Sequence, residues 1–316
     1  MILPDKKPVS SVQPVKTLGS ALRRGLYYAG YGLECFILGK RKPIAAGVPL
    51  TDCCNLSCKH CVVKEGNRGH FSYKQICGWI DQFYAAGARV LYLQGGEILL
   101  WHDGDKRPND VIAYARKRGY FHVAAVTNGT LPIDLQTDAL WVSFDGPPKI
   151  HDSIRGTGAF DKLRENVSAS SHNRIFANFT LNRINAAYVG EMVAEVNRIP
   201  NFKGISVNFH TPYIGVEALA LSRKERKDCV ETLLDLKKAG QRILNSIAGL
   251  KALASGMYPR PLWTIRLVEQ GRMFDCCWGR EQPGVCEQCG YGIIAEMASM
   301  MRMRPSAIMQ ALGLFN

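Results

Sequence analysis

The sequence predicts an α/β protein whose core is an open barrel of parallel strands. Two observations lead to this prediction: short apolar runs rich in β-formers recur along the chain, and segments with helical periodicity lie between most of them. Strands that alternate with helices form parallel sheets. The chain has 316 residues, 47% of them hydrophobic, which is enough to bury one full core. Because we find six strands and a closed barrel of this kind has eight, we expect a partial, six-stranded (β/α)6 barrel.

The strands and two helix starts can be placed on the sequence. Ser72 is expected to cap a helix that runs to Ala86, and Asn185 a helix that runs to Arg198. One strand should lead into a cysteine-rich loop that begins near Thr51. The other five are expected at "RVLYLQ" (89–94), "FHVAAVT" (121–127), "ALWVSF" (139–144), "RIFANFTL" (174–181) and "GISVNF" (204–209).

The cysteine-rich loop, "TDCCNLSCKHCVV" (51–63), contains Cys54, Cys58 and Cys61 in the spacing CxxxCxxC. The opening segment "MILPDKKPVSSVQPVK" lacks the apolar stretch typical of a secretory signal, so we expect a cytoplasmic protein, in which disulfides are rare. A dense cysteine cluster in such a protein indicates metal binding or redox chemistry.

Three thiolates in one compact loop fit an iron–sulfur cluster better than they fit zinc. Structural zinc sites usually take four ligands from two separated pairs, whereas compact loops of this kind hold iron–sulfur clusters. A four-iron cluster bound by three thiolates has one iron without a protein ligand, and that iron can bind a substrate or cofactor. A zinc loop and unrelated buried thiols remain the alternatives. Cys53 is a spare thiol beside the motif.

Polar, glycine-containing turns follow three neighbouring predicted strands. They are Gly95-Gly96-Glu97, Thr127-Asn128-Gly129 and Asp145-Gly146. Ligands bind where the carboxyl ends of parallel strands meet, and glycine lets a backbone approach a ligand closely. Each turn alone has an ordinary loop composition. Their repetition at successive strand ends favours a binding site.

Together these motifs resemble the radical S-adenosylmethionine superfamily. The resemblance covers about residues 45 to 210 and depends on three features in this order: Cys54-xxx-Cys58-xx-Cys61, Gly95-Gly96-Glu97 and "VSFDGPPKIHDSIRG". It implies a partial TIM-like barrel, a 4Fe-4S cluster on the three cysteines, and S-adenosylmethionine as cofactor. It further implies reductive cleavage of that cofactor to a 5′-deoxyadenosyl radical, with an electron donor such as flavodoxin or ferredoxin.

The resemblance also implies where the cofactor binds. Gly95, Gly96 and Glu97 would meet its methionine amino group, and adenine would lie near the "GISVNF" strand. His60, which stands where the family usually has an aromatic residue, could still pack on adenine. The ribose and carboxylate would lie near Thr127, Asn128, Ser143, Asn178 and Arg155.

Asp145 and Arg155 have two interpretations of equal weight. They can form an ordinary structural ion pair, or they can serve the cofactor or the substrate, because charged residues in clefts do either. The sequence identifies no residue that acts on the substrate itself.

Basic residues outnumber acidic ones by 40 to 27, and the net charge of +13 favours anionic partners. The front segment "LGSALRRGLYYAGYGLECFILGKRKP" mixes apolar and aromatic residues with Arg23, Arg24 and the basic run at 40–42, and its apolar part is too short to cross a membrane. It is either an amphipathic helix on an anionic membrane surface or a helix packed across the open end of the barrel. No nucleic-acid motif is recognisable, so nucleic acid is not an expected partner.

A second cysteine group lies in the tail segment "FDCCWGREQPGVCEQCGYG". Cys276, Cys277, Cys286 and Cys289 supply four thiolates, which can saturate a second iron–sulfur cluster or a structural zinc ion. The tail lacks the longer seven-cysteine pattern of the peptide-modifying subfamily, which counts against a peptide substrate without excluding it.

A looser resemblance concerns the substrate. The "GKRKP" run, Trp278-Gly279 and the "CEQCGYG" segment resemble the hopanoid-side-chain radical enzymes, which attach an adenosyl group to a polycyclic isoprenoid lipid. This resemblance implies a lipid or isoprenoid substrate, met by a peripheral protein at the membrane surface. A peptide or small metabolite is the alternative substrate, and a non-enzymatic iron–sulfur electron carrier is the alternative function.

We expect three parts along the chain. They are an N-terminal helical segment (1–44), the radical S-adenosylmethionine partial barrel (45–240), and a helical, Cys-rich C-terminal extension (241–316).

Overall fold

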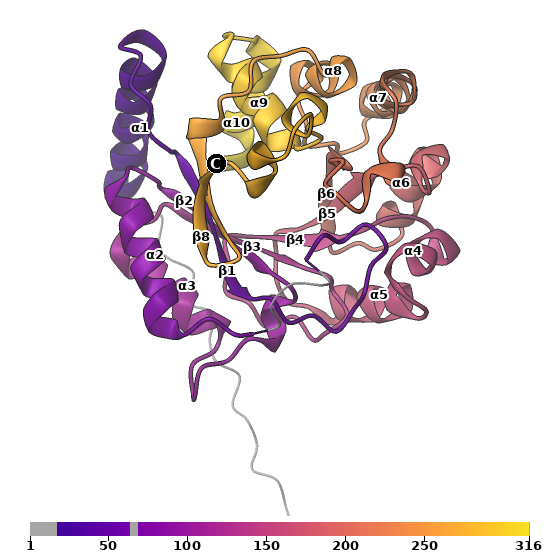
Figure 1. Cartoon of the computed structure of the whole chain (residues 1–316), viewed down its shortest axis with the longest axis horizontal. Coiled ribbons are helices and arrows are strands. Elements are labelled where there is room, and N and C mark those ends of the chain that lie inside the picture. The colour runs from indigo at the N-terminus through magenta and orange to yellow at the C-terminus, as the bar shows by residue number, and fades with distance from the viewer. Residues whose placement is uncertain (1–17, 64–68, 316) are drawn as a thin grey trace, which may run out of the picture. The chain divides into compact units, whose positions relative to one another are not determined.

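The protein is described here from a computed structural model, in which residues 18–63 and 69–315 are described (Figure 1). The opening segment in which we found no secretory signal lies outside the described residues. The chain divides into two compact units, Met1–Arg41 and Lys42–Asn316. Each unit is considered by itself below.

The first unit contains helix α1 (Leu18–Gly32), which continues into a π-helical turn, Leu33–Ile37. Leu22, Leu26, Leu33 and Ile37 recur at helical spacing on one side, and all four are more than half exposed. After the turn, Lys40 pairs with Glu34 at 3.2 Å. Nowhere in the described ranges does a helix have the length and apolarity needed to cross a membrane.

The second unit is built on one eight-stranded sheet with the order β6-β5-β4-β3-β2-β1-β7-β8. Six strands run parallel, as predicted: β1 (Ala45–Thr51), β2 (Val90–Gly95), β3 (His122–Thr127), β4 (Ala139–Ser143), β5 (Ile175–Leu181) and β6 (Phe202–Phe209). The sequence prediction missed the two further strands. β7 (Ile265–Glu269) pairs in parallel with β1, and β8 (Arg272–Asp275) returns antiparallel to β7.

Helices connect the strands and lie along the outer side of the curved sheet in this unit (Figure 1). The partial α/β barrel expected from the sequence is confirmed, with its sheet not closed. The helices between β1 and β6 are α2 (Tyr73–Ala85), α3 (Pro108–Arg118), α4 (Pro148–Arg155), α5 (Ala159–Ala169) and α6 (Val189–Asn197). Those after β6 are α7 (Arg223–Lys238), α8 (Ile247–Ser255), α9 (Gly292–Met301) and α10 (Pro305–Phe315).

One of the two predicted helix starts is confirmed. The Ser72 hydroxyl accepts a hydrogen bond from the Gln75 amide at 3.2 Å, and α2 follows it. The prediction for Asn185 is wrong, because α6 begins at Val189 after a short 3-10 turn. The Asn185 side chain makes other bonds: its amide donates to the Asp145 carbonyl at 3.0 Å, and its oxygen accepts from the Asn182 amide.

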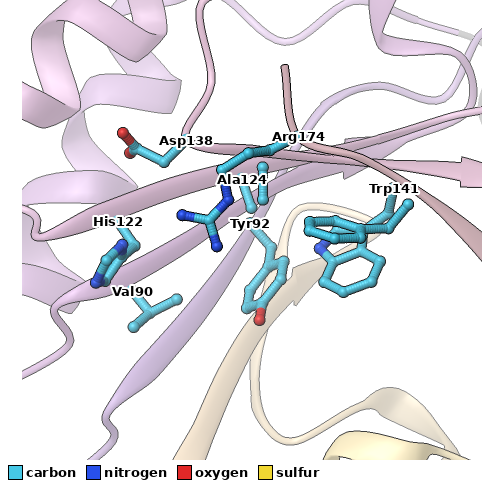
Figure 2. Close-up of a pocket in the computed structure, with 9 residues that line it drawn as sticks. Val90, Tyr92, His122, Ala124, Asp138, Trp141 and Arg174 are labelled. Carbon is cyan, nitrogen blue, oxygen red and sulfur yellow. The ribbon is translucent and has the colours of Figure 1, made fainter. Parts of the chain in front are cut away.

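Side chains alternate between two different environments along the strands. Leu91, Leu93, Leu140 and Val142 point toward the helices and are fully buried. On the other, concave face, Tyr92 and Trp141 lie near Val90 and His122 from the starts of the strands (Figure 2), and Phe176 lines the same cavity. This cavity has a volume of about 60 Å³, and the rings of Trp141 and Phe176 lie 4.9 Å apart. The interior of the partial barrel is therefore aromatic at its base.

The C-terminal segment joins the two edges of the sheet. Cys276 follows directly on β8 at one edge. At the other edge, the Phe209 amide donates to the Gly290 carbonyl at 2.8 Å, and the Gly292 amide donates to the Asn208 side chain at 2.9 Å. Residues 276–292 thus bridge the gap between β8 and β6, and all four tail cysteines lie within this bridge.

Candidate functional site

The cysteine loop is fixed to the end of β2 through backbone contacts. The Gly96 amide donates to the Thr51 carbonyl at 2.7 Å, and the Glu97 amide donates to the Cys53 carbonyl at 2.8 Å. A Cβ atom on Gly95 would lie 2.2 Å from the Thr51 carbonyl oxygen, and one on Gly96 would lie 2.0 Å from the Cys53 carbonyl oxygen. Only glycine fits at either position, so the two glycines position the cysteine loop as well as the strand end.

The three thiols of the CxxxCxxC loop interact electrostatically with one another, and N–H donors approach two of them. The Leu56 amide lies 3.4 Å from the Cys54 sulfur, and the Asn128 side-chain amide lies 3.8 Å from it. The Arg155 guanidinium approaches the Cys58 sulfur at 3.9 Å. Burial, followed by the neighbouring Cys61 thiol, raises the pKa of Cys58 to about 11, even though Arg155 lowers it. A bound metal cation would favour the deprotonated thiolate forms of these neighbouring cysteines.

In the ranges 18–63 and 69–315, no three His, Cys, Asp or Glu side chains already stand in a metal-coordinating arrangement. The donor set still fits an iron–sulfur cluster in kind, because compact loops of thiolates hold such clusters and backbone and side-chain N–H groups donate to their sulfurs. Cys53, the spare thiol, is half-buried next to the loop, and its amide donates to the Thr51 hydroxyl at 2.9 Å.

Glu97 is completely buried, and its carboxylate joins the ends of β2 and β3. It accepts hydrogen bonds from the Thr127 hydroxyl at 2.7 Å, the Asn128 amide at 2.7 Å and the Leu99 amide at 3.1 Å. Burial raises the pKa of Glu97, while these hydrogen bonds act in the opposite direction. The side chains of Glu97 and Thr127 are thus hydrogen-bonded to each other. The groups that the segment from Gly95 to Glu97 offers to a ligand are therefore those of its backbone.

Asn128 connects β3 to the cysteine loop. Its side-chain amide donates to Asn55 at 2.9 Å as well as approaching the Cys54 sulfur, and its oxygen accepts from the Thr130 hydroxyl at 2.6 Å. Thr130 in turn accepts from Asn55 at 2.8 Å. This polar triangle holds Cys54 against the end of β3. The sequence analysis did not single out Asn55, although it lies within the CxxxCxxC loop, or Thr130, which directly follows Thr127-Asn128-Gly129.

Asp145 and Arg155 form a buried ion pair next to the cysteine loop. The Arg155 Nε donates to an Asp145 carboxylate oxygen at 2.6 Å, and the His60 Nε2 lies 3.9 Å from the same oxygen. Burial alone would raise the pKa of Asp145, but the Arg155 guanidinium holds it below its ordinary value. The ion pair, one of the two interpretations given from the sequence, is therefore present, and the same arginine also reaches Cys58.

His151 is a site residue that the sequence analysis did not single out, although it lies within the quoted "HDSIRG" segment. Its Nδ1 accepts from the Asp145 amide at 3.2 Å, and its ring contacts Phe144 and Phe160. Burial lowers the pKa values of His151 and His60 to about 4, so both rings are neutral at pH 7.

Three buried polar atoms around this ion pair have no partner in the described part of the chain. They are His60 Nδ1, Asp145 Oδ1 and His151 Nε2. Buried polar atoms are nearly always hydrogen-bonded. Arg155, His60 and His151 all interact electrostatically with Asp145, and the unpartnered atoms fit a polar ligand with several donors and acceptors, such as an amino acid or a nucleoside.

Ser143 and Asn178 lie at the carboxyl ends of β4 and β5, in register with each other. By strand alternation they share the concave face with Trp141 and Phe176. The Asn178 oxygen accepts from the Asn208 side chain at 2.9 Å, which ties β5 to β6. The predicted site residues therefore gather at one edge of the sheet, above the aromatic base of the barrel.

The tail cysteines form a second, separate group. Cys276, Cys277 and Cys289 are buried and Cys286 is half-buried. The Tyr213 hydroxyl donates to the Cys277 sulfur at 3.4 Å, and its ring stacks on Trp278 with centroids 5.4 Å apart. Cys276 has a φ of 73°, a left-handed conformation that is costly for a side chain other than glycine.

The electrostatic environment of the tail cysteines fits a bound group. Arg226 donates to the Gln288 carbonyl at 2.8 Å and the Cys289 carbonyl at 3.4 Å, so a buried cation supports this loop. The Tyr258 hydroxyl and Arg260 Nε are buried without a partner in the described ranges, and both side chains interact electrostatically with Cys289.

Comparisons with known proteins agree with this geometry. Residues 48–184 match the model of the Radical SAM superfamily. The mycofactocin maturase MftC of Mycobacterium tuberculosis is 28% identical over 187 residues, covering 52% of this chain and 45% of MftC. The AdoMet-dependent heme synthase of Nitratidesulfovibrio vulgaris is 33% identical over 131 residues, covering 37% of this chain and 34% of the synthase. Both matches thus span less than half the length of the curated relative.

The fold is similar to that of a solved structure. Streptococcus suis SuiB bound to precursor peptide SuiA superimposes with a TM-score of 0.60 at 12% identity, covering 93% of this chain and 73% of that chain.

Proposed function

Because residues 48–184 form a radical SAM superfamily domain, we propose that this protein is an enzyme that reductively cleaves S-adenosylmethionine and uses the resulting radical on a peptide or small metabolite. One observation carries the proposal. The loop with Cys54, Cys58 and Cys61 is fixed by Gly95 and Gly96 to the end of β2, and Arg155, which reaches Cys58, pairs with Asp145, whose second carboxylate oxygen lacks a partner in the described residues. A metal centre and a polar cofactor can therefore bind side by side.

The chain's own residues have distinct roles in this proposal. A four-iron cluster, when bound, supplies the electron that cleaves the cofactor. Cys54, Cys58 and Cys61 would hold it, while Asn128 and Arg155 donate toward the sulfurs. Arg155 could also donate to the cofactor carboxylate, because only its Nε is bonded to Asp145. The backbone of Gly95 to Glu97 would meet the amino group, and His60 would lie beside adenine.

The substrate class rests on the relatives. MftC is named as a maturase and the second relative as a heme synthase, and neither name refers to a lipid. A lipid or isoprenoid substrate, which the looser resemblance implied, is a second candidate. One observation favours it: α1 and the turn that follows it expose Leu22, Leu26 and Ile37 on one side, as a helix at a membrane surface does.

We also propose that Cys276, Cys277, Cys286 and Cys289 bind a second iron–sulfur cluster or a zinc ion. The support is the burial of three of these thiols and the unpartnered Tyr258 hydroxyl and Arg260 Nε that interact with Cys289. Such a centre would connect β8 to β6 across the opening of the sheet.

The decisive experiment compares Cys58→Ala with Cys53→Ala after anaerobic reconstitution. We expect Cys58→Ala to lose the cluster absorbance and all formation of 5′-deoxyadenosine under dithionite or reduced flavodoxin. Cys53→Ala, one residue from the motif, should keep both. Full cleavage by Cys58→Ala would refute the assignment of ligands. A wild-type protein that holds iron but forms no 5′-deoxyadenosine would instead favour an electron carrier.

Substrate class is tested by adding peptide, metabolite and lipid fractions to the reconstituted enzyme. The correct fraction should raise the rate of 5′-deoxyadenosine formation and yield a modified product by mass spectrometry. Stimulation by lipid extracts alone, with an adenosylated product, would establish the second candidate.

A further inference from the structure

A hollow with basic walls lies between α8, α9 and the start of α10, and one of its lining residues, Tyr258, also interacts with the tail cysteine Cys289. Its volume is about 440 Å³. Lys251, Arg302 and Arg304 line it, together with the hydroxyls of Ser255, Ser299 and Ser306. No acidic side chain lines it. Three cations and no carboxylate at one concave surface produce a field that attracts anions.

The three cations of this hollow, unlike most others nearby, have no acidic partner within the described ranges. On α7, by contrast, Lys224 pairs with Asp228 at 3.1 Å and Lys238 pairs with Asp235 at 2.9 Å. The charges of Lys251, Arg302 and Arg304 are therefore not neutralised by the protein. Each side chain is exposed and can reach a ligand in the hollow.

Exposed apolar side chains accompany the hollow. Met257 lines it and is 70% exposed. In the adjoining chain, Met303 is 67% exposed, Met309 73% and Leu312 62%. Met309 and Leu312 lie three residues apart on one face of α10. Met303 stands between the two arginines with a φ of 54°, a left-handed conformation that a non-glycine residue rarely adopts. The sharp corner between α9 and α10 thus displays a methionine flanked by cations.

We propose that this surface docks the protein on an anionic phospholipid membrane. Headgroup phosphates would bind Lys251, Arg302 and Arg304 in the hollow, while Met303, Met309 and Leu312 enter the boundary between headgroups and acyl chains. A nucleic acid would satisfy the cations but leave the apolar residues in water. A second copy of the same surface would bring like charges together. The membrane is the partner that matches both the charge and the apolar rim.

The inference does not depend on the proposed reaction, and its test does not use enzyme activity. Reconstituted full-length protein is mixed with phosphatidylcholine vesicles that contain or lack phosphatidylglycerol, and binding is measured by flotation. We expect salt-sensitive binding to the anionic vesicles only. Because one basic residue near an anionic surface changes partitioning about fivefold, Lys251→Gln/Arg302→Gln/Arg304→Gln should weaken binding about 100-fold.

Two further variants separate charge from apolar contact. Lys74→Gln/Lys117→Gln/Lys162→Gln removes the same charge from exposed positions on α2, α3 and α5 and should bind within a few-fold of wild type. Met309→Gln/Leu312→Gln keeps every charge and should weaken binding about tenfold, most visibly at high salt. Thermal unfolding and iron content of all variants should equal those of wild type, because the changed side chains are exposed.

Four outcomes would overturn the proposal. They are no flotation at low salt, equal loss in the Lys74 control, binding that is unchanged in the Lys251 triple variant, and binding of RNA or soluble glycerol phosphate through the same three cations without any binding of vesicles. Unchanged binding in the triple variant would move the membrane contact elsewhere, with α1 the next segment to test.

Discussion

Replacing Gly96 with alanine tests whether the contact between β2 and the cysteine loop builds the site. The new Cβ would lie 2.0 Å from the Cys53 carbonyl oxygen and 2.5 Å from its carbonyl carbon. Both are backbone atoms, so the clash cannot be relieved by a side-chain rotation. The strand end and the loop must separate, which breaks the bonds from Gly96 to Thr51 and from Glu97 to Cys53.

Overpacking of a tight contact costs about 1–3 kcal/mol, and each lost buried hydrogen bond adds about 1 kcal/mol. We therefore expect Gly96→Ala to lower the free energy of unfolding by roughly 3–5 kcal/mol, measured by urea denaturation. The protein that remains folded should bind less iron, because Cys54 is displaced from Asn128.

The matched control is Gly78→Ala in the middle of α2, where a Cβ meets nothing within 4 Å. This change should stabilise the protein by about 0.5–1 kcal/mol, as alanine does in helices. The reasoning is refuted if Gly96→Ala has the urea midpoint and the iron content of wild type.

Three further predictions concern the tail, the response to pH and the bridge between the sheet edges. If the tail holds an iron–sulfur cluster, wild-type protein should bind about eight irons and Cys286→Ala/Cys289→Ala about half of that; one zinc with one cluster would establish zinc in the tail. Burial lowers the pKa of His172, whose Nδ1 accepts a hydrogen bond from the Arg174 amide. The contribution of this histidine to stability is therefore present above the pKa that histidine has in the unfolded chain, about 6.5, and is lost as the pH falls below that value. Stability measured from pH 7.5 to 5.5 should therefore fall in wild type and fall less in His172→Gln; equal slopes would contradict this. Tyr213→Phe should cost about 1 kcal/mol through its lost hydrogen bonds, whereas Tyr213→Ala should cost about 3–5 kcal/mol because the stacking on Trp278 is lost as well. Equal urea midpoints for the two variants would argue against that stacking.

The sequence was sufficient for the parts of the fold that follow local rules. The six parallel strands follow from apolar runs, and the Ser72 cap follows from the hydrogen bond that its hydroxyl can make to the first turn. The wrong prediction at Asn185 has a tertiary cause. Its amide bonds to Asp145, 40 residues earlier, and no local pattern reveals such a contact.

The same limit applies to β7, β8 and the site. "IRLVE" and "RMFD" are short and mixed in polarity. The first becomes a strand because β1 offers an open edge, and the second because it pairs with the first. Within the site, the cysteine spacing and the glycine pair could be recognised from sequence. His151 could not be singled out, because its role depends on burial beside Asp145 and on contacts with Phe144 and Phe160.

The bridge made by residues 276–292 has a consequence for the order of events during synthesis. The six parallel strands and the cysteine loop are complete by Phe209, but the segment that joins β8 to β6 is synthesised after them. The nascent barrel therefore passes through a stage in which its core strands exist and one side is still uncovered. Delivery of a preassembled metal centre by a carrier protein is sterically easiest during this interval. A truncated chain that ends at residue 240 would lack this bridge and would allow that stage to be studied.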